Sequence, residues 1–360
     1  MAILGILISL ALLMWLAYRG VNVIVLAPVL AMLAVLFDGQ FALLPAYTQI
    51  FMTAMGGFVI AFFPLFLLGA IFGKVMEDTG SAAAIARAIA RVLGERRAIA
   101  ATVLACAVLT YGGVSLFVVV FAVYPLAAAM FRAADIPKRL VPGAIALGAF
   151  TFTMTALPGT VQIQNMIPMR YFGTTAFAAP VTGSIAAVIM LGAGLWWLQR
   201  RANRARLRGE GYGDGHTCEP AAAIDRLPPL WAALAPIACV LIANYVLSER
   251  VIPRWDPAPL AKPPLGPLSL SDVRGVWATI VALVLAIGVA APLFLRTARS
   301  FNTSLTQGAL GSLLPVFNTA SEVGYGKTIA ALAGFAVVKS SLLSMPGSVL
   351  VSEYVAVNAL

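Results

Sequence analysis

Along almost its whole length, the chain alternates long apolar runs that carry no charge with short polar or basic stretches. A helix needs roughly 20 predominantly apolar residues to cross the hydrocarbon core of a membrane. The pattern therefore predicts an all-α polytopic membrane protein. We predict single spans at residues 2–18, 21–37, 54–73, 175–199, 229–248 and 274–295. Only Arg19 and Gly20 separate the first two, which we interpret as a tight helical hairpin in preference to one bent helix.

Residues 77–97 differ from these spans because apolar and basic side chains are interleaved at helical spacing. This pattern is typical of an amphipathic helix that lies at a membrane surface, although an ordinary basic loop is the alternative. The apolar members are Ile85, Ile89, Val92 and Leu93, and the basic ones are Arg87, Arg91, Arg96 and Arg97.

The charge-free stretch 98–131 is too long for one span and too short for two. It is interrupted near Gly112 and Gly113, which leaves two apolar arms that each reach only part of the way through a bilayer. We predict a re-entrant hairpin, because non-helical backbone at membrane depth is tolerated only where protein or a water-filled cavity satisfies it. A single kinked span is the alternative.

Residues 140–169 are also charge-free and interrupted. Pro158 disfavours helical geometry at Leu157, and Gly159 follows directly, so we predict a broken helix. The carboxamides of Gln162, Gln164 and Asn165 come next, and such groups are costly within a membrane unless they face a cavity or each other.

The second half repeats this arrangement in kind. We predict a hairpin around 300–345 with its polar break at 318–326, and the start of a second broken helix at 350–360. Paired discontinuous segments in two halves point to the binding site of a transporter. We therefore divide the chain into a first repeat at 1–208, a polar linker at 209–228 and a partial second repeat at 229–360. Because Leu360 falls inside a predicted spanning segment, we expect a fragment or a truncated product.

Composition supports the membrane class. Hydrophobic residues make up 61% of the chain and charged residues 11%, with a mean hydropathy of +0.95. A soluble domain has about a quarter of its residues charged. The net charge of +10 does not indicate nucleic-acid binding, because the basic residues lie in short runs between apolar stretches. The basic loop at 200–208 is instead placed in the cytoplasm by the positive-inside rule.

The residue inventory argues against an enzyme. His216 is the single histidine and lies in a polar loop, so an intramembrane serine protease lacks its base. Every aspartate lies in a loop or at a segment end, and there is no phosphate-binding Gly-x-x-x-x-Gly-Lys loop. The three cysteines form no CxxC pair, so neither a disulfide framework nor a metal site is predicted, and we expect no cofactor.

What remains is a set of uncharged polar groups clustered at the breaks. The N-terminus of a half-helix directs backbone N–H groups and the positive end of its dipole toward an anion, and nearby hydroxyls and amides suit a hydroxylated carboxylate. For each residue alone, helix packing is the other interpretation. The candidate substrate-binding residues are Gly112, Gly113, Ser115, Gly159, Thr160, Gln162, Gln164, Asn165, Asn318, Thr319 and Ser321.

Glu322 is the candidate for proton coupling, because an acid at a predicted break within the membrane can take up and release a proton as access alternates. The alternative is a structural carboxylate that caps a half-helix or pairs with Lys327. Glu353 is a second, weaker candidate.

At the three breaks the sequence resembles the GntP family of gluconate permeases, within the ion transporter superfamily. The likeness is carried by Thr110-Tyr111-Gly112-Gly113-Val114-Ser115-Leu116-Phe117, by the run from Ala156 to Asn165, and by the run from Asn318 to Gly326. The resemblance implies proton-coupled uptake of a small hydroxylated carboxylate across the bacterial inner membrane. It also implies two inverted repeats, elevator-like movement and a homodimer.

Two points stay open at this stage. Four predicted crossings between the two hairpins would place both on the same side of the membrane, whereas inversion requires opposite sides, so either residues 296–316 hide a crossing or one count is wrong. The alternatives to proton symport are a sodium-coupled carboxylate carrier, a cation/proton antiporter and a fragment that does not transport.

Overall fold

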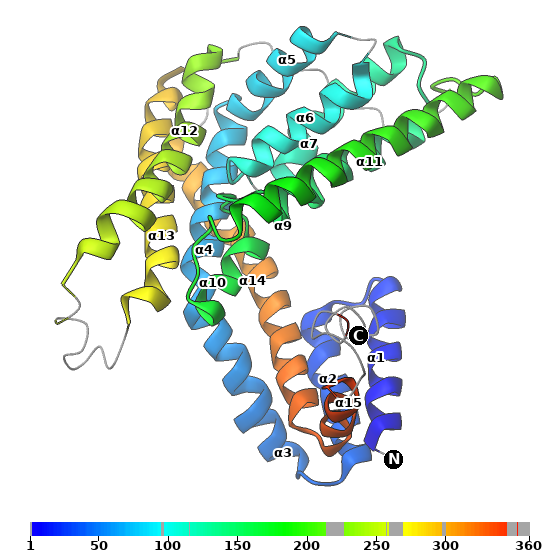
Figure 1. Ribbon diagram of the computed structural model, residues 1–360, viewed down its shortest axis with the longest axis vertical. Helices are drawn as coiled ribbons and strands as arrows, with labels where there is room; N and C mark the ends of the chain where they lie inside the picture. Colours follow the sequence, from blue (N-terminus) through cyan, green and yellow to red (C-terminus); the bar gives the residue numbers. More distant parts are fainter. Residues whose placement is uncertain are drawn as a thin grey trace. The chain divides into compact units, whose positions relative to one another are not determined.

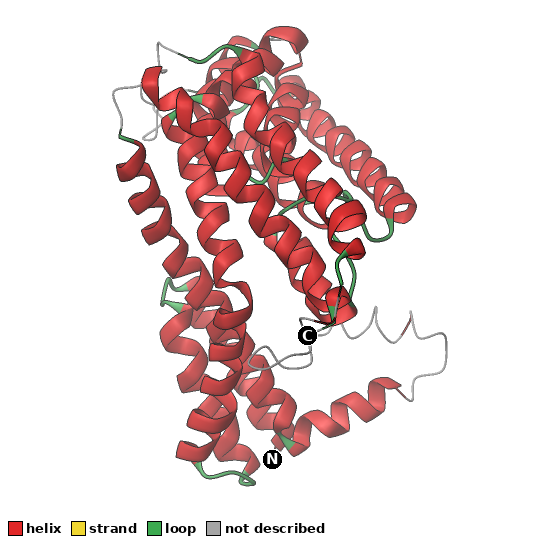
Figure 2. Ribbon diagram, turned by 90° about the vertical axis from the view of Figure 1, so that its left-hand side faces the viewer, coloured by secondary structure: helices red, strands yellow, loops and turns green. Residues whose placement is uncertain are grey.

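The structure is a computed structural model that describes residues 2–94, 97–114, 116–213, 227–256, 258, 269–296, 300–343 and 351. Within these residues it is helical throughout and contains no strand, as Figure 2 shows. The predicted all-α class is therefore confirmed. Residues 350 and 352–360, which include Glu353, and His216 in the polar linker lie outside the described part.

The chain forms two compact units that are not the two predicted repeats. Unit 1 comprises residues 1–63 and 313–360, and unit 2 comprises residues 64–312. The chain passes from one unit to the other inside two helices, α4 (Met52–Asp78) and α14 (Phe301–Ala331). Since compactness and internal repetition are different properties, the repeat boundaries at 208 and 229 stay a prediction.

Unit 1 begins with the predicted helical hairpin. Helices α1 (Ala2–Tyr18) and α2 (Val23–Asp38) pack against each other, and Gly20 makes the turn between them with a φ of 85°. Small side chains let two helices approach closely, and Ala27, Ala31 and Ala34 of α2 are fully buried. The hairpin, not one bent helix, is the observed structure.

The rest of unit 1 is built from five further elements or parts of elements. A short α3 (Leu43–Pro45) and a π-helical turn, η1 (Ala46–Phe51), lead into the first turns of α4. The last part of α14 and α15 (Ala333–Leu343) complete the unit, and α15 packs against α1, beside which it lies in Figure 1.

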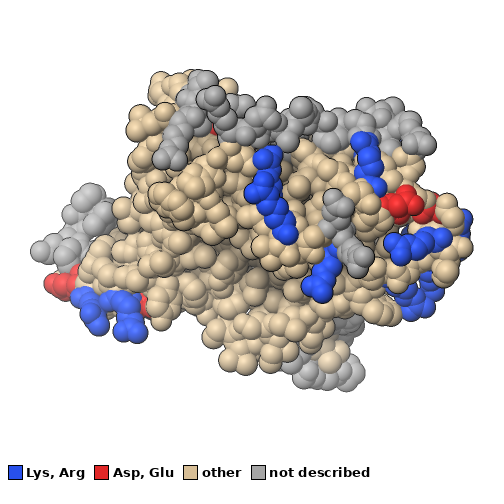
Figure 3. All heavy atoms as spheres, turned by 90° about the horizontal axis from the view of Figure 1, so that it is seen from above, with Lys and Arg blue, Asp and Glu red and all other residues tan. Residues whose placement is uncertain are grey.

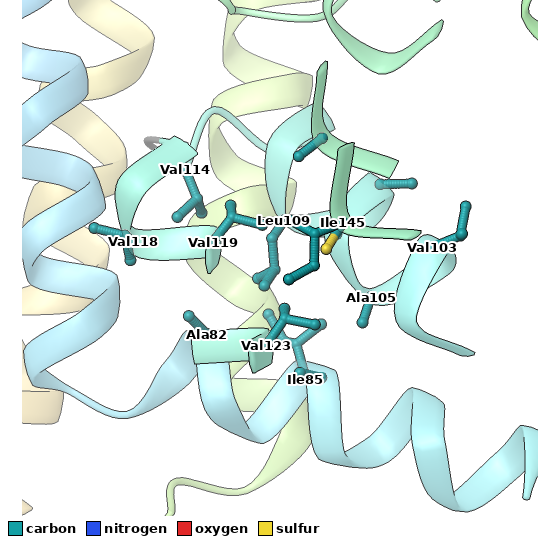
Figure 4. Packing of buried hydrophobic residues seen from close by; sticks show 14 of the residues in the cluster. Ala82, Ile85, Val103, Ala105, Leu109, Val114, Val118, Val119, Val123 and Ile145 are labelled. Carbon is teal, nitrogen blue, oxygen red and sulfur yellow. The ribbon is translucent and has the colours of Figure 1, made fainter. Parts of the chain in front are cut away.

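Unit 2 is packed around one largely buried helix. Most residues of helix α6 (Ala98–Tyr111) are buried, only one side of it is half-buried, and α5 (Ser81–Leu93), α7 (Leu116–Ala133) and α8 (Val141–Phe150) pack around it. Figure 4 shows Leu109 of α6 beside Val119 and Val123 of α7 and near Ile85 of α5. A helix that is apolar all round is expected in such a core position.

The remaining helices of unit 2 include the longest apolar ones. They are α9 (Phe152–Thr155), α10 (Ile163–Phe172), α11 (Pro180–Leu207), α12 (Leu230–Val246) and α13 (Leu270–Ala290). By length and composition, four segments among the described residues are long and apolar enough to cross a membrane: Leu43–Asp78, Pro180–Leu207, Leu230–Arg254 and Val273–Leu295. The protein is a multi-pass membrane protein.

Within the segment 77–97, the predicted helix is present but shorter, as α5 from Ser81 to Leu93, because α4 continues to Asp78 and Gly94 ends α5. Ile85 and Ala86 are buried against neighbouring helices, and the side chain of Arg91 is exposed. Val92, however, is 86% exposed, so it does not belong to the buried face. Because α5 packs on α6, α7 and α12, its amphipathic pattern is explained by packing inside unit 2, and a position at the membrane surface stays a prediction.

Two sequence predictions about helix ends are wrong. The basic run at 200–208, predicted as a loop, continues α11 as far as Leu207. Arginine is a good helix former, and no glycine or proline interrupts the run before Gly209. The polar break predicted at 318–326 is absent, because α14 is continuous from Phe301 to Ala331 and the helix axis is interrupted only at Leu332.

Candidate functional site

The first break lies at the tip of the α6–α7 hairpin. Helix α6 ends at Tyr111, and Gly113 takes a left-handed conformation with a φ of 86° that favours glycine. A Cβ atom at Gly113 would collide with the side chain of Val161. A second glycine is needed at position 112, where a Cβ atom would lie 2.6 Å from Ile237. Ser115 lies outside the described residues.

The second break lies between α9 and α10, as predicted. The chain is non-helical from 156 to 162, and Gly159 has a φ of 87°. Two hydrogen bonds to Ala176 hold this segment: the backbone N–H of Gly159 donates to its carbonyl at 2.6 Å, and Asn165 Nδ2 donates to the same oxygen at 3.0 Å. Asn165 Nδ2 also donates to the Thr160 carbonyl at 2.9 Å.

The two breaks meet inside unit 2. Gln162 Nε2 donates to the backbone carbonyl of Thr110 at 2.7 Å and to that of Val114 at 3.2 Å. In the other direction, the Tyr111 hydroxyl donates to the Pro158 carbonyl at 2.8 Å. These bonds link the end of α6 and the loop after it to the non-helical segment 156–162.

Two hydroxyls at this junction have no hydrogen-bond partner among the residues that the structure describes. Thr110 and Thr160 are both fully buried, and neither Oγ1 atom makes a hydrogen bond. Buried polar groups are nearly always paired, and an unpaired one costs about 1–3 kcal/mol. A third such hydroxyl, on Thr102, lies on α6 about 12 Å from Thr110, two turns nearer the start of the helix.

The predicted carboxamides have three different environments. Gln162 is 8% exposed and holds the hairpin tip, and Asn165 holds the second break. Their donor groups are therefore committed to backbone carbonyls. Gln164, in the first turn of α10, is exposed. The structure thus brings Gly112, Gly113, Gly159, Thr160 and Gln162 together in one place, and Gln164 does not join them.

The second set of candidates lies on α14 in unit 1, on an unbroken helix. Asn318, Ser321 and Tyr325 share one face at helical spacing. Ser321 is fully buried and its Oγ donates to the Ile24 carbonyl at 3.4 Å. The Tyr325 hydroxyl lies 2.9 Å from Ser9 Oγ of α1, and the buried Oδ1 atom of Asn318 has no hydrogen-bond partner. Thr319, next to this face, is half-buried.

Glu322 lies away from that polar face. Its side chain is exposed, and residues five apart on an α-helix are separated by about 140° around the axis. Lys327 therefore projects from a different side, and within the described ranges no ion pair joins the two residues. The pairing alternative is thus not observed, and the coupling role stays a prediction.

One acidic residue escaped the sequence analysis. Asp78, at the end of α4, is 8% exposed, accepts a hydrogen bond from Ser304 Oγ at 2.6 Å, and lies 3.3 Å from Lys74 Nζ. The i, i+4 spacing of Lys74 and Asp78 was a signal for the pair. Nothing in the sequence pointed to Ser304, which lies far away along the chain.

The described residues contain no group of three or more histidine, cysteine or acidic side chains that could hold a metal ion. Outside the membrane segments, one ion pair is well formed. Arg139 Nε and Nη2 donate to the two carboxylate oxygens of Glu210 at 2.5 and 2.7 Å. This bidentate pair lowers the pKa of Glu210 through its hydrogen bond and charge, and raises the pKa of Arg139 for the same reasons.

The sequence is similar to a family of permeases and to one bacterial transporter. A sequence model described as GntP family permease matches residues 1–314. An uncharacterized transporter of Bacillus subtilis (strain 168), YxjC, is 46% identical, with the match covering 95% of this chain and 75% of that protein. No solved structure matches the chain with significance.

Proposed function

Since the chain belongs to the GntP family of permeases, we propose that it is a secondary transporter that imports a small hydroxylated carboxylate, such as gluconate, together with protons. We assign it to the bacterial inner membrane. The transporter class follows from the family, and the substrate, the coupling ion and the site are the proposed part.

The proposal rests on one observation. The tip of the α6–α7 hairpin meets the non-helical segment 156–162, and two hydroxyls at this junction, those of Thr110 and Thr160, lack hydrogen-bond partners among the described residues. Helix α10 begins at this junction, and its first backbone N–H groups and dipole favour an anion. Thr110 and Thr160 lack protein partners, so each hydroxyl is free to donate to or accept from a substrate hydroxyl. A carboxylate with neighbouring hydroxyl groups matches this combination.

Binding at this junction requires movement. Thr110 and Thr160 are fully buried and Gln162 nearly so, so the described conformation is closed. Substrate entry would separate the α6–α7 tip from the 156–162 segment, which only a few hydrogen bonds and the contact of Gly113 with Val161 hold together. A closed state that encloses the ligand and an open state that releases it are what alternating access requires.

For coupling we propose Glu322, with Asp78 as the rival. Glu322 is an exposed acid on a helix whose neighbouring polar residues are buried. Asp78 is the buried acid, and it is already engaged by Lys74 and by the hydroxyl of Ser304. Within the described ranges Glu322 forms no ion pair, which favours Glu322 as the coupling group.

The test is uptake of labelled gluconate by proteoliposomes that contain the purified chain. We expect accumulation with an inward proton gradient and no added sodium. Glu322→Gln should abolish proton-driven accumulation and leave gluconate exchange intact, while Asp256→Asn, the loss of an exposed acid elsewhere in the chain, should leave both intact.

Other results would change the assignment. Accumulation that needs sodium and ignores the proton gradient would make the protein a sodium-coupled carrier. Loss of proton coupling in Asp78→Asn, with normal coupling in Glu322→Gln, would transfer the role to Asp78. Absence of both uptake and exchange would refute the transport proposal for this chain.

A further inference from the structure

Helix α11 is longer than the apolar core of a membrane requires. Its apolar part, from Pro180 to Leu198, is about 28 Å long, close to the roughly 30 Å of the hydrocarbon core. The remaining residues, Gln199 to Leu207, extend the helix by about 13 Å, which exceeds the depth of one headgroup layer. This second part, here called the basic extension, therefore passes through the headgroup region.

The basic extension has one packed side and one open side. Leu198, Ala202 and Ala205 are buried and fix the helix to unit 2. The arginines of the extension are all exposed, as is Arg208 at the C-cap of the helix. Those of the extension are Arg200, Arg201, Arg204 and Arg206. Figure 3 shows Lys and Arg side chains gathered at its right-hand edge, on the side where the last turns of α11 lie in Figure 1.

A groove of about 440 Å³ runs along the open side. It is lined by Trp196, Gln199, Arg200, Asn203, Arg204 and Leu207, which recur at the spacing of one helix face. The guanidinium of Arg200 lies 5.3 Å from the centre of the Trp196 ring, a cation–π distance that holds the arginine over the indole. Arg200 and Arg204 are four residues apart, so both charges face the same groove.

The charges of this groove are not neutralised by any acidic side chain that the structure describes. Within the described ranges, no acidic side chain forms an ion pair with Arg200 or Arg204. The nearby Glu210 is paired with Arg139 instead. A second cavity of about 530 Å³, on the other side of the extension, includes Asp135 beside Arg206, and that carboxylate disfavours an anion there.

We propose that the groove on the basic extension binds the headgroup of an anionic phospholipid of the cytoplasmic leaflet. Arg200 and Arg204 hold the phosphate, since the planar guanidinium donates two parallel hydrogen bonds to such a group. Trp196 contacts the glycerol and the upper acyl chain, the depth at which tryptophan is enriched in membrane proteins. The negative surface of that leaflet attracts basic segments adjacent to a membrane span.

The experiment is native mass spectrometry of the full chain, purified in detergent and titrated with phosphatidylglycerol or with phosphatidylcholine of the same acyl chains. We expect phosphatidylglycerol to be retained preferentially. Arg200→Gln with Arg204→Gln should weaken its binding on the order of 30-fold, from about a fivefold contribution per arginine. All these side chains are exposed, so helicity by circular dichroism should not change.

The matched control is Arg206→Gln with Arg208→Gln, which removes the same charge from the end of α11 and its C-cap, outside the groove. It should retain most of the phosphatidylglycerol binding. Equal losses in both double variants would overturn the proposal in favour of unspecific surface charge. Equal retention of the two lipids by the unmodified protein would overturn it without any variant, and displacement by millimolar inorganic phosphate would make this a site for the free anion.

Discussion

At the scale of single residues, the unpaired threonine hydroxyls are the most informative feature of the structure. Thr110 and Thr160 are fully buried at the junction of two helix breaks, and neither hydrogen-bonds to the protein. Neither hydroxyl therefore stabilises the fold through a hydrogen bond within the protein. Valine, which has a methyl group in place of the hydroxyl, would serve the fold equally well, so we attribute the two hydroxyls to contact with a ligand.

Thr160→Val and Thr110→Val should accordingly raise the apparent KM for gluconate uptake by roughly tenfold, the effect of losing one hydrogen bond to a ligand. The melting temperature should not fall, because no hydrogen bond within the protein is lost. Thr102→Val is the matched control, since its hydroxyl is also buried and unpaired but lies two turns away. A similar rise in KM for all three variants would show that the effect is not local.

Gln162 and Gln164 differ only in what surrounds them. Gln162→Met removes two buried hydrogen bonds, to the carbonyls of Thr110 and Val114, so it should reduce the free energy of unfolding by about 1–3 kcal/mol. Gln164→Met, at an exposed site, should leave stability unchanged. Thermal unfolding of the detergent-purified variants measures both. An equally stable Gln162→Met would mean that the two breaks do not depend on this bond.

At the scale of elements, the sequence predicts breaks where the backbone itself requires them. Gly113 and Gly159 have left-handed conformations, and Pro158 disfavours helix at the residue before it, so the two breaks of unit 2 followed from residue type alone. That these breaks dock on each other could not be predicted, because it depends on long-range bonds such as that from Gln162 to Thr110.

The break predicted on α14 is absent because the residues at 318–326 permit a break but do not require one. Asn, Thr and Ser and isolated glycines weaken a helix without ending it, and tertiary contacts outweigh such propensities. Ser321 donates to a carbonyl of α2, and Gly324 packs within reach of the Phe51 ring, where a Cβ atom would lie 3.0 Å away. The polar pattern at 318–326 is therefore a packing face as well as a candidate site.

The segment that follows α11 is tied to the loop after α7 by charge. The backbone N–H of Tyr212 donates to Asp135 Oδ1 at 2.9 Å, and Arg139 holds Glu210 in a bidentate pair. Because the pair lowers the pKa of Glu210 below its ordinary value of 4.5, it stabilises the folded state above that value. The contribution is lost as the pH falls through the lowered pKa of the folded state.

The pH dependence of this contribution can be measured by comparing the melting temperatures of the unmodified protein and of Glu210→Gln. The unmodified protein should melt at a slightly higher temperature at pH 7, and the difference should vanish as the pH falls below about 4.5, toward acid. Both side chains are exposed, so high salt should reduce the difference as well. Arg139→Gln should remove the same increment, and a larger loss in the double variant than in either single variant would contradict a shared origin.

At the scale of the whole molecule, family membership and the multi-pass helical architecture are established, and the repeat organisation is not. The two compact units divide α4 and α14, so they cut across the repeats that the sequence suggests. Helix α14 is about 46 Å long, enough to cross a bilayer. It is not among the four candidate spans, so a crossing near 296–316, which an inverted arrangement needs, stays a prediction.

The central claim is that the junction of the two breaks in unit 2 encloses the substrate. The most direct measurement is protection of Thr160→Cys, in a background without the native cysteines, from a membrane-impermeant thiol reagent during gluconate titration. The account predicts that gluconate slows this labelling in a saturable manner and that an unrelated sugar without a carboxylate does not. Labelling of Thr160→Cys at a rate that gluconate leaves unchanged, in protein that still transports gluconate, would contradict it.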